Sequence, residues 1–308
     1  VTVNAVNDAP VAATGLSATT FEDQSIVVTL SGTDVDGDAL TFSLASDATD
    51  GSVMINGSVA IYTPNLDFSG SDSFEFSVSD GELSDSATVS VTVESVNDAP
   101  VLATLSDVSF DEDGSGSTSL SADDVDGDAL TFSISGGDQI TASLSGSDVS
   151  FSAPANYNGS ETFTVTVSDG NGGEDSQSIT VTVNAVNDAP VAATGLSTVT
   201  FEDESIVVTL SGTDVDGDAL TFSLASDATN GSVMINGSVA TYTPDANFNG
   251  DDSFEFNVSD GELSDSATVS VTVESVNDAP VLATLSDVSF DEDGSGSTSL
   301  SASDVDGD

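Results

Sequence analysis

The string VTVNAVNDAP at residues 1–10 returns as VTVESVNDAP at 91–100, VTVNAVNDAP at 181–190 and VTVESVNDAP at 271–280, so successive copies start 90 residues apart. A fixed period of this length is typical of a tandem array in which each repeat is one folded unit. A longer period is superposed on it, because residues 1–17 recur unchanged at 181–197 and residues 271–302 reproduce 91–122. The array therefore alternates between two types of repeat.

Within one repeat, short runs of Val, Ile, Thr and Phe alternate with polar residues and are separated by Gly, Asp and Asn. In the first repeat we expect strands at 17–21, 25–30, 39–45, 51–55, 58–62, 73–79 and 84–93. Seven short strands with a turn every 8–12 residues indicate an all-β fold, a Greek-key sandwich of immunoglobulin-like type repeated in a linear array. The expected core residues are Phe42, Tyr62, Phe74 and Phe76, with Phe132, Phe151, Phe163 and Val165 as their counterparts in the second repeat.

The repeats follow one another with almost no linker. We divide the chain into the last strand of a preceding repeat at 1–3, three repeats at 4–93, 94–183 and 184–273, and the start of a fourth at 274–308. Pro100 restricts its own φ and that of the residue before it, so the joint should be short and semi-rigid. The chain begins in a final strand and stops within an unfinished repeat, so we expect it to belong to a longer array.

The charge of the chain has one sign only. It contains 54 Asp and Glu, no Lys, Arg or His, and has a formal net charge of −54. Side-chain ion pairs cannot form, and clustered carboxylates must draw their counter-charge from metal, salt or a partner. Nucleic acid is excluded as a partner because phosphate binding depends on Lys and Arg, and anionic membranes are excluded for the same reason. Cys is absent, so no disulfide or thiolate site is available.

The acidic string DVDGD occurs at 34–38, 124–128, 214–218 and 304–308. Calcium binds six to eight oxygen atoms, and carboxylates one residue apart on a loop can provide several of them. The alternative interpretation is an Asp-Gly turn on a solvated loop. Four copies in a chain without cationic side chains favour metal. The string is not an EF-hand loop, because its Gly is fourth rather than sixth and its twelfth position is Ala45.

Four motifs in a constant order make the chain resemble a known family. The VNDAP linker, the Glu after the first strand, the Asp-x-Asp of DVDGD and the later SDG are similar to those of bacterial cadherin-like tandem repeats of giant calcium-dependent surface adhesins. The resemblance covers the whole chain. It implies Ca²⁺ between successive domains, held jointly by the upper domain, the linker and the lower domain.

The ligands that this resemblance implies fall into four sets. The joint between the first two repeats would use Glu22, Asp67, Asn97, Asp98, Asp124, Asp126 and Asp169. The next joint would use Glu112, Asn187, Asp188, Asp214, Asp216 and Asp260, and the last Glu202, Asn277, Asp278, Asp304 and Asp306. The half-joint at the start of the chain keeps Asn7, Asp8, Asp34, Asp36 and Asp80.

The linker departs from the cadherin pattern, because Ser95 and Ala99 stand where an extra Asp and Asn are usual. The number of ions per joint is therefore open, with Asp38, Asp128 and Asp218 as additional local ligands. The SDG aspartates have an alternative of their own, since Asp-Gly at a strand end commonly forms a hairpin turn.

The function that follows is an extracellular spacer at a bacterial cell surface, in an adhesin or filament, with repeats tied together by Ca²⁺. Its partners would be calcium ions, neighbouring repeats and like chains associated laterally through calcium. An adhesive or carbohydrate-binding module is the alternative. An enzyme is disfavoured, although paired carboxylates can hydrolyse glycosides, because the same pairs recur in each repeat. Adaptation to high salt would explain the charge but not where the motifs lie. No stretch reaches the ~20 apolar residues of a membrane span, and residue 1 lies in a strand pattern rather than a signal peptide.

Overall fold

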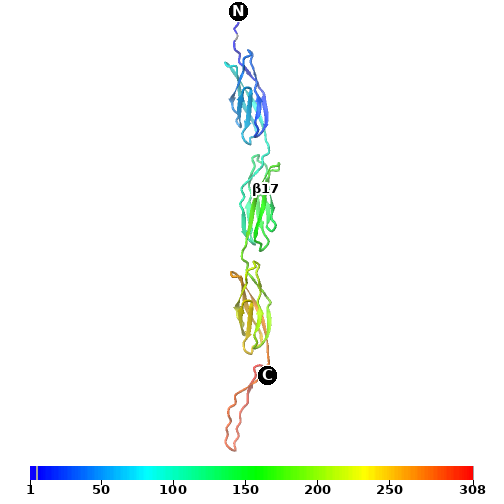
Figure 1. Cartoon of the computed structure of the whole chain (residues 1–308), viewed down its shortest axis with the longest axis vertical. Helices are drawn as coiled ribbons and strands as arrows, with labels where there is room; N and C mark the ends of the chain where they lie inside the picture. Colours follow the sequence, from blue (N-terminus) through cyan, green and yellow to red (C-terminus); the bar gives the residue numbers. More distant parts are fainter. Residues whose placement is uncertain (5, 308) are drawn as a thin grey trace. The chain divides into compact units, whose positions relative to one another are not determined.

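The computed structural model describes residues 1–4 and 6–307, and in this part of the chain every regular element is a β-strand. Figure 1 shows the strands coloured along the sequence. The prediction of an all-β fold is confirmed. None of the described residues forms a helix long and apolar enough to cross a membrane. Asp308, the last residue of the fourth DVDGD string, lies outside the described residues.

The chain divides by its contacts into two compact units. The first contains residues 1–109, 115–152 and 160–182, and the second contains residues 110–114, 153–159 and 183–308. The first repeat lies entirely in the first unit, and the third lies entirely in the second unit.

The first repeat is a two-layered sandwich with a short additional pair of strands. Its strands are β1 (Val11–Ala12), β2 (Leu16–Phe21), β3 (Ile26–Thr29), β4 (Gly32–Thr33), β5 (Thr41–Ser46), β6 (Gly51–Asn56), β7 (Val59–Pro64), β8 (Gly70–Ser79) and β9 (Ser84–Glu94). One sheet has the order β2-β9-β8-β5, the other β3-β7-β6, and β1 pairs with β4. Strand β2 runs parallel to β9, whereas the other pairs are antiparallel.

The core of this sandwich follows from alternation along its strands. Side chains two residues apart point to the same face of a strand, so the apolar residues of β8 and β9 all face inward. Tyr62, Phe74 and Phe76 are at most 1% exposed, which confirms them as core residues. Phe42 is half-buried and packs its ring 6.2 Å from that of Phe76. Complete burial of an aromatic or aliphatic side chain of this size stabilises a fold by roughly 1.5–3 kcal/mol.

The second repeat has the same element order. Its strands are β10 (Val101–Leu102), β11 (Val108–Asp111), β12 (Ser115–Ser119), β13 (Ala122–Asp123), β14 (Thr131–Gly136), β15 (Thr141–Ser145), β16 (Asp148–Ser152), β17 (Gly159–Ser168) and β18 (Glu174–Asn184). Strand β16 lies between β12 and β15, and β14 pairs with β17. Phe151, Phe163 and Val165 are buried, with the two rings 5.3 Å apart, while Phe132 is half-buried.

The second unit contains the sandwich of the third repeat. Its strands are β19 (Val191–Ala192), β20 (Ser197–Phe201), β21 (Ile206–Thr209), β22 (Gly212–Thr213), β23 (Thr221–Ser226), β24 (Gly231–Asn236), β25 (Val239–Pro244), β26 (Gly250–Ser259) and β27 (Ser264–Glu274). The sheets are β20-β27-β26-β23, β21-β25-β24 and β19-β22. The paired strands β28 (Val281–Leu282) and β29 (Ala302–Ser303) follow.

The structure corrects the expected strands in two ways. Each of the first three repeats has nine strands among its described residues rather than seven, because the expected set misses the two-residue pair that includes Val11–Ala12 and Gly32–Thr33. Two residues are too few to show a period. Strand β8 starts at Gly70, three residues before the expected start at 73. The first three residues pair with β9, but none of them has an apolar side chain that would have indicated a strand.

Candidate metal centres

Each repeat buries one glutamate directly after its first long strand. Glu22, Glu112 and Glu202 are 4%, 7% and 3% exposed. One oxygen of each accepts a hydrogen bond from the backbone N–H of a linker valine, at Val96, Val186 and Val276 respectively. The other oxygen of Glu112 and of Glu202 is buried and has no hydrogen-bond partner among the described residues.

A buried carboxylate oxygen without a partner is costly, because burial removes its water and nothing replaces it. In this chain no Lys, Arg or His exists to provide the missing charge. The donor set around these glutamates consists of carboxylate and amide oxygens, which are the ligands of hard divalent cations such as Ca²⁺. The residues therefore fit the metal that the family resemblance implies.

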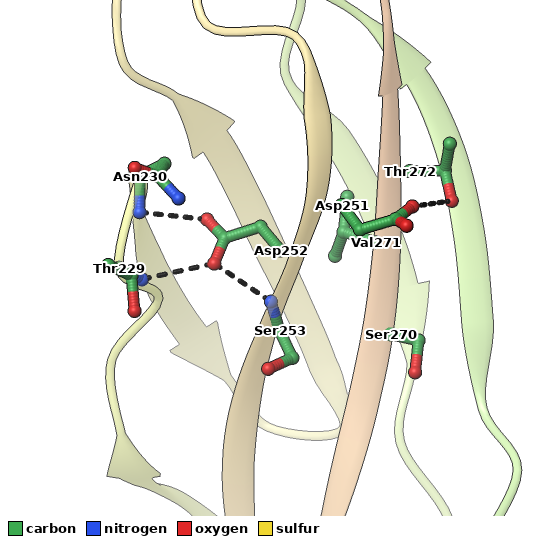
Figure 2. A pocket seen from close by; sticks show the side chains of 8 residues that line it. All are labelled: Thr229, Asn230, Asp251, Asp252, Ser253, Ser270, Val271 and Thr272. Carbon is green, nitrogen blue, oxygen red and sulfur yellow. Dashed lines mark hydrogen bonds between the residues drawn. The ribbon is translucent and has the colours of Figure 1, made fainter.

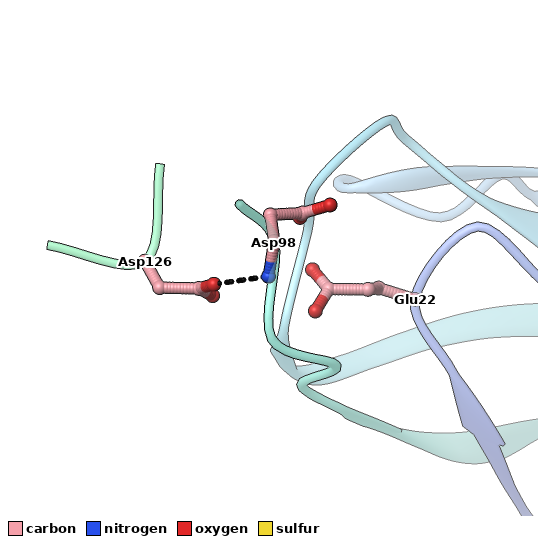
Figure 3. Close-up of side chains that lie close together, drawn as sticks. All are labelled: Glu22, Asp98 and Asp126. Atoms are coloured by element: carbon pink, nitrogen blue, oxygen red, sulfur yellow. Dashed lines mark hydrogen bonds between the residues drawn. The ribbon is translucent and has the colours of Figure 1, made fainter. Parts of the chain in front are cut away.

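One linker carboxylate and one loop carboxylate lie beside the buried glutamate. Figure 3 shows the side chain of Glu22 directed toward Asp98, whose backbone N–H donates to Asp126 Oδ2 at 2.8 Å. One oxygen from each of the three carboxylates lies within 4.8 Å of the other two. Glu202, Asp278 and Asp306 form the same cluster.

The electrostatics of this position are unfavourable for a free carboxylate. Burial raises the pKa of Asp98, and the neighbouring charges of Asp67 and Asp126 raise it further. Burial and the nearby Asp216 likewise raise the pKa of Asp188 in the second unit. Asp98 and Asp188 therefore ionise less readily than usual until a positive charge is supplied.

The DVDGD strings form tight carboxylate loops. One oxygen from each of Asp34, Asp36 and Asp38 lies within 4.8 Å of the others, and the same holds for Asp124, Asp126 and Asp128 and for Asp214, Asp216 and Asp218. Asp34 Oδ1 accepts the N–H of Gly37 at 2.9 Å and of Asp38 at 3.2 Å, whereas its Oδ2 is buried and has no hydrogen-bond partner in the described part of the chain. The same loop thus forms both the turn and the cluster of carboxylate oxygens. Asp34 Oδ1 belongs to the turn, which leaves Asp34 Oδ2 for a ligand.

The SDG aspartates receive hydrogen bonds from both the hairpin turn and the linker. Asp80 Oδ1 accepts the N–H of Glu82 and of Leu83, each at 2.7 Å, and its Oδ2 accepts the side-chain amide of Asn7 at 2.9 Å. The N–H groups of Leu83 and Glu82, followed by Asn7, lower the pKa of Asp80. These aspartates therefore cap a turn and hold the linker asparagine, which leaves the carbonyl oxygen of that asparagine available as a ligand.

The remaining predicted ligands are hydrogen-bonded within their joints, with a different partner for the linker asparagine of the last joint. Asn97 donates to Asp169 at 2.8 Å and Asn187 donates to Asp260 at 2.9 Å. The N–H groups of Asp8, Asp188 and Asp278 donate to Asp36, Asp216 and Asp306 at 2.8, 2.8 and 2.6 Å. Asn277 donates to the carbonyl of Asp278, and Asp304 Oδ1 accepts the N–H of Asp306. Asp124 and Asp214 accept the N–H groups of their own loops.

The structure adds a group of residues that the sequence prediction missed. Asp23, Asp113 and Asp203 each follow a buried glutamate and adopt a positive φ of 58°, 60° and 62°. Each accepts a hydrogen bond from the backbone N–H of a residue in the loop before β8 or its equivalent, at Asp67, Asn156 and Asn247. Their signal in the sequence is the last residue of the FED and DED strings, the aspartate directly after the glutamate.

A separate hollow on the third sandwich contains a carboxylate, Asp252, whose role is structural. Figure 2 shows Asp252 accepting the N–H groups of Thr229, Asn230 and Ser253 at 3.1, 2.9 and 2.9 Å. The buried Tyr242 hydroxyl also donates to it, at 3.0 Å. This carboxylate anchors the loop before β24, and its oxygens are already occupied by protein donors.

Comparison with known proteins identifies a family and solved structures that share this architecture. The family of bacterial Ig domains matches residues 7–92, 97–182 and 187–272. Among solved structures, mouse cadherin-23 EC22-24 superposes with a TM-score of 0.55 at 19% identity, covering 88% of this chain and 100% of that one. A structure of the protocadherin gammaB7 EC3-6 cis-dimer gives a TM-score of 0.54 at 18% identity, covering 97% of this chain and 84% of that one. These similarities confirm the prediction of cadherin-like tandem sandwiches.

One curated relative is an enzyme by name. Chitinase A of Pseudoalteromonas piscicida is 34% identical over 113 residues, which are 36% of this chain and 14% of that protein. The chain thus spans a small part of this relative's length. Tandem domains of the Ig and cadherin-like kind are typically non-enzymatic and suggest an extracellular structural or adhesive role.

Proposed function

The chain belongs to the family of bacterial Ig domains, and from that premise we propose that its repeats form an extracellular spacer stiffened by Ca²⁺ bound at the joints between them. The repeats would be those at 4–93, 94–183 and 184–273, followed by the start of another at 274–308. Domains of this kind are typically extracellular or surface-exposed, which supports a place at the cell surface.

The observation that carries the proposal is the buried glutamate of each joint. In a chain with no cationic side chain, Glu112 and Glu202 each bury an oxygen that has no hydrogen-bond partner among the described residues. Carboxylates of the linker and of the DVDGD loop gather beside Glu22 and Glu202. A divalent cation there would supply the missing counter-charge and draw together residues of two repeats and their linker.

The stiffening follows from electrostatics. Without a cation, the clustered carboxylates repel one another, and the joint bends or opens to separate them. A bound cation attracts each of these carboxylates, and this attraction outweighs the repulsion between them. Because the cation binds the folded joint and not the unfolded chain, it also stabilises the fold by mass action.

The proposed ligands come from three places at each joint. Glu22, Asn97, Asp98, Asp124 and Asp126 would hold the ion between the first two repeats, with Asp67 and Asp169 at its margin. Like chains would associate laterally through the same ions where exposed carboxylates of two copies approach each other.

Chelation tests the proposal. The maximum dimension of the chain should decrease in small-angle X-ray scattering, and its melting temperature should fall, when Ca²⁺ is replaced by EDTA. The matched control contains NaCl at the same ionic strength, because a net charge of −54 responds to any salt. Equal dimensions and equal melting temperatures in Ca²⁺ and in this control would overturn the proposal.

A further inference from the structure

One sheet of the first repeat has an outer face without charge. Outward side chains alternate with core side chains along β3, β6 and β7, and the outward ones are Val, Ile, Met, Thr, Ser and Asn. None of the outward residues of these three described strands is acidic, whereas the outer face of the other sheet contains Glu75 and Glu94. In a chain with a net charge of −54, this face therefore adds no repulsion of its own to a contact with another acidic surface.

An apolar row crosses the middle of the uncharged face. Val27 on β3 and Met54 on β6 both pair with Ile61 on β7. The three side chains are 59%, 71% and 39% exposed, in that order, and Val59 extends the row along β7. Single exposed apolar residues are ordinary on protein surfaces, but a contiguous apolar group with a polar border is typical of an interaction site.

The second repeat shows that the sandwich forms without this row. Ser117 on β12 and Ser143 on β15 both pair with Ser150 on β16, at the positions equivalent to the apolar row. A hollow lined mainly by serine lies on this face of the second repeat. Because serine at all three positions supports the same strand pairing, the apolar side chains of the first repeat are not required for folding. A contact outside the sandwich accounts for them.

The apolar row returns in the third repeat. Val207 on β21 and Met234 on β24 both pair with Thr241 on β25 and are 61% and 75% exposed. The outward residues of these three described strands are again all uncharged. Two copies of the chain have these rows at the same spacing, so two rows can meet two rows when the copies are related by a two-fold axis. This match favours a second copy of the chain as the occupant of the face.

We propose that two copies of this chain associate side by side through the apolar rows of the β3-β7-β6 and β21-β25-β24 sheets. The contact needs no calcium, and so differs from association through the ions of the joints. Three strands about 4.8 Å apart and about five residues long cover roughly 240 Å². A stable interface buries roughly 800 Å² per partner, so one row binds weakly and two or more rows per chain act together through their effective concentration.

The net charge decides the conditions under which the copies meet. Two chains of −54 repel each other over the Debye length, which is about 30 Å at 0.01 M salt and about 3 Å at 1 M. Burial of apolar side chains is not screened by salt. Association through the rows should therefore increase with NaCl concentration, whereas a contact made of ion pairs would weaken.

Sedimentation velocity of the whole chain in EDTA, at about 10 mM and about 1 M NaCl, tests the proposal. The test variant combines Val27→Ser, Met54→Ser, Val207→Ser and Met234→Ser, which give the first and third repeats the serines of the second. The control combines Val11→Ser and Val191→Ser, which remove valines of matching exposure, 58% and 60%, from strands outside the face. The parent and the control should associate at high salt, and the test variant should lose at least about tenfold in association constant because it buries less apolar surface.

A gain of function complements this loss. Ser117→Val with Ser143→Met gives the second repeat an apolar row and should raise the association constant above that of the parent. Circular dichroism spectra and melting temperatures close to those of the parent would verify that the variants fold. A parent that stays monomeric at both salt concentrations, or a test variant that associates as strongly as the parent, would overturn the inference. Association that requires Ca²⁺ and ignores the four serines would also overturn it, and would leave the proposed function standing.

Discussion

Replacement of Glu112 by Gln should change the stability of the chain in opposite directions with and without calcium. The side chain is 7% exposed and has one oxygen bonded to the N–H of Val186 and one buried without a partner among the described residues. Glutamine has nearly the same shape, and its carbonyl can still accept the bond from Val186. The substitution therefore removes the buried charge and little else.

The magnitude follows from the two states. Without calcium, the unpartnered oxygen is charged and costs more to bury than the neutral amide nitrogen that replaces it, so Glu112→Gln should raise the free energy of unfolding by about 1 kcal/mol. With calcium at a hundredfold excess over Kd, the parent gains about 2.7 kcal/mol per site, and the variant should lose most of this gain. At roughly 4–8 °C per kcal/mol for a domain of this size, the parent transition should rise by roughly 10–20 °C on addition of calcium.

Differential scanning calorimetry in EDTA and in Ca²⁺ measures both differences. The matched control is Glu174→Gln, which removes the same charge from an exposed position of the same repeat. The control should behave like the parent in both buffers. A variant at Glu112 that is less stable than the parent in EDTA would refute the view of this carboxylate as an uncompensated buried charge. An unchanged calcium shift would refute its role as a ligand.

Three further predictions concern the anchor of the loop before β6. Tyr62 donates to Asp72 Oδ2 at 2.9 Å from a fully buried position, so Tyr62→Phe should lower the free energy of unfolding by about 1 kcal/mol in chemical denaturation, whereas an unchanged midpoint would contradict the bond. Burial raises the pKa of Asp72, but the Ser73 N–H and the Tyr62 hydroxyl are the leading hydrogen bonds that bring it below its usual value. The Asp72 carboxylate therefore stabilises the fold above the unfolded pKa of about 3.9, and this stabilisation is lost as the pH falls through the lower folded pKa. Because Asn does not titrate, the free energy of unfolding of Asp72→Asn should decrease less than that of the parent in acid titrations. A Cβ at Gly51 would lie 2.5 Å from the Tyr62 ring, so Gly51→Ala should destabilise the first sandwich by about 1–3 kcal/mol, whereas Ser52→Ala at its exposed neighbour should not.

The sequence determined the repeat architecture because its signals are periodic. Four VNDAP strings at equal spacing define the array, and alternation along the strands is enough to place Tyr62, Phe74 and Phe76 in the core. Alternation is readable because each long strand has one buried face. The pair β1 and β4 escaped prediction because strands of two residues have no period to read.

The composition of the candidate metal centres was also readable in the sequence, but their geometry was not. A chain without cations that repeats NDAP, Glu and DVDGD indicates where counter-charge is needed. Only the fold shows that Glu112 buries an oxygen without a partner, or that Asp80 is bonded by both its turn and Asn7.

The contacts of the loop before β8 and of its equivalent before β17 depend on tertiary structure in the same way. Asp67 and Asn156 are visible in the sequence as a difference between two loops, among many such differences. The fold brings these loops beside the aspartate that follows the buried glutamate, 44 and 43 residues earlier in the chain. Electrostatic interaction depends on distance in space and not along the chain, so the sequence determined which charges exist and the tertiary structure decided which of them act on one another.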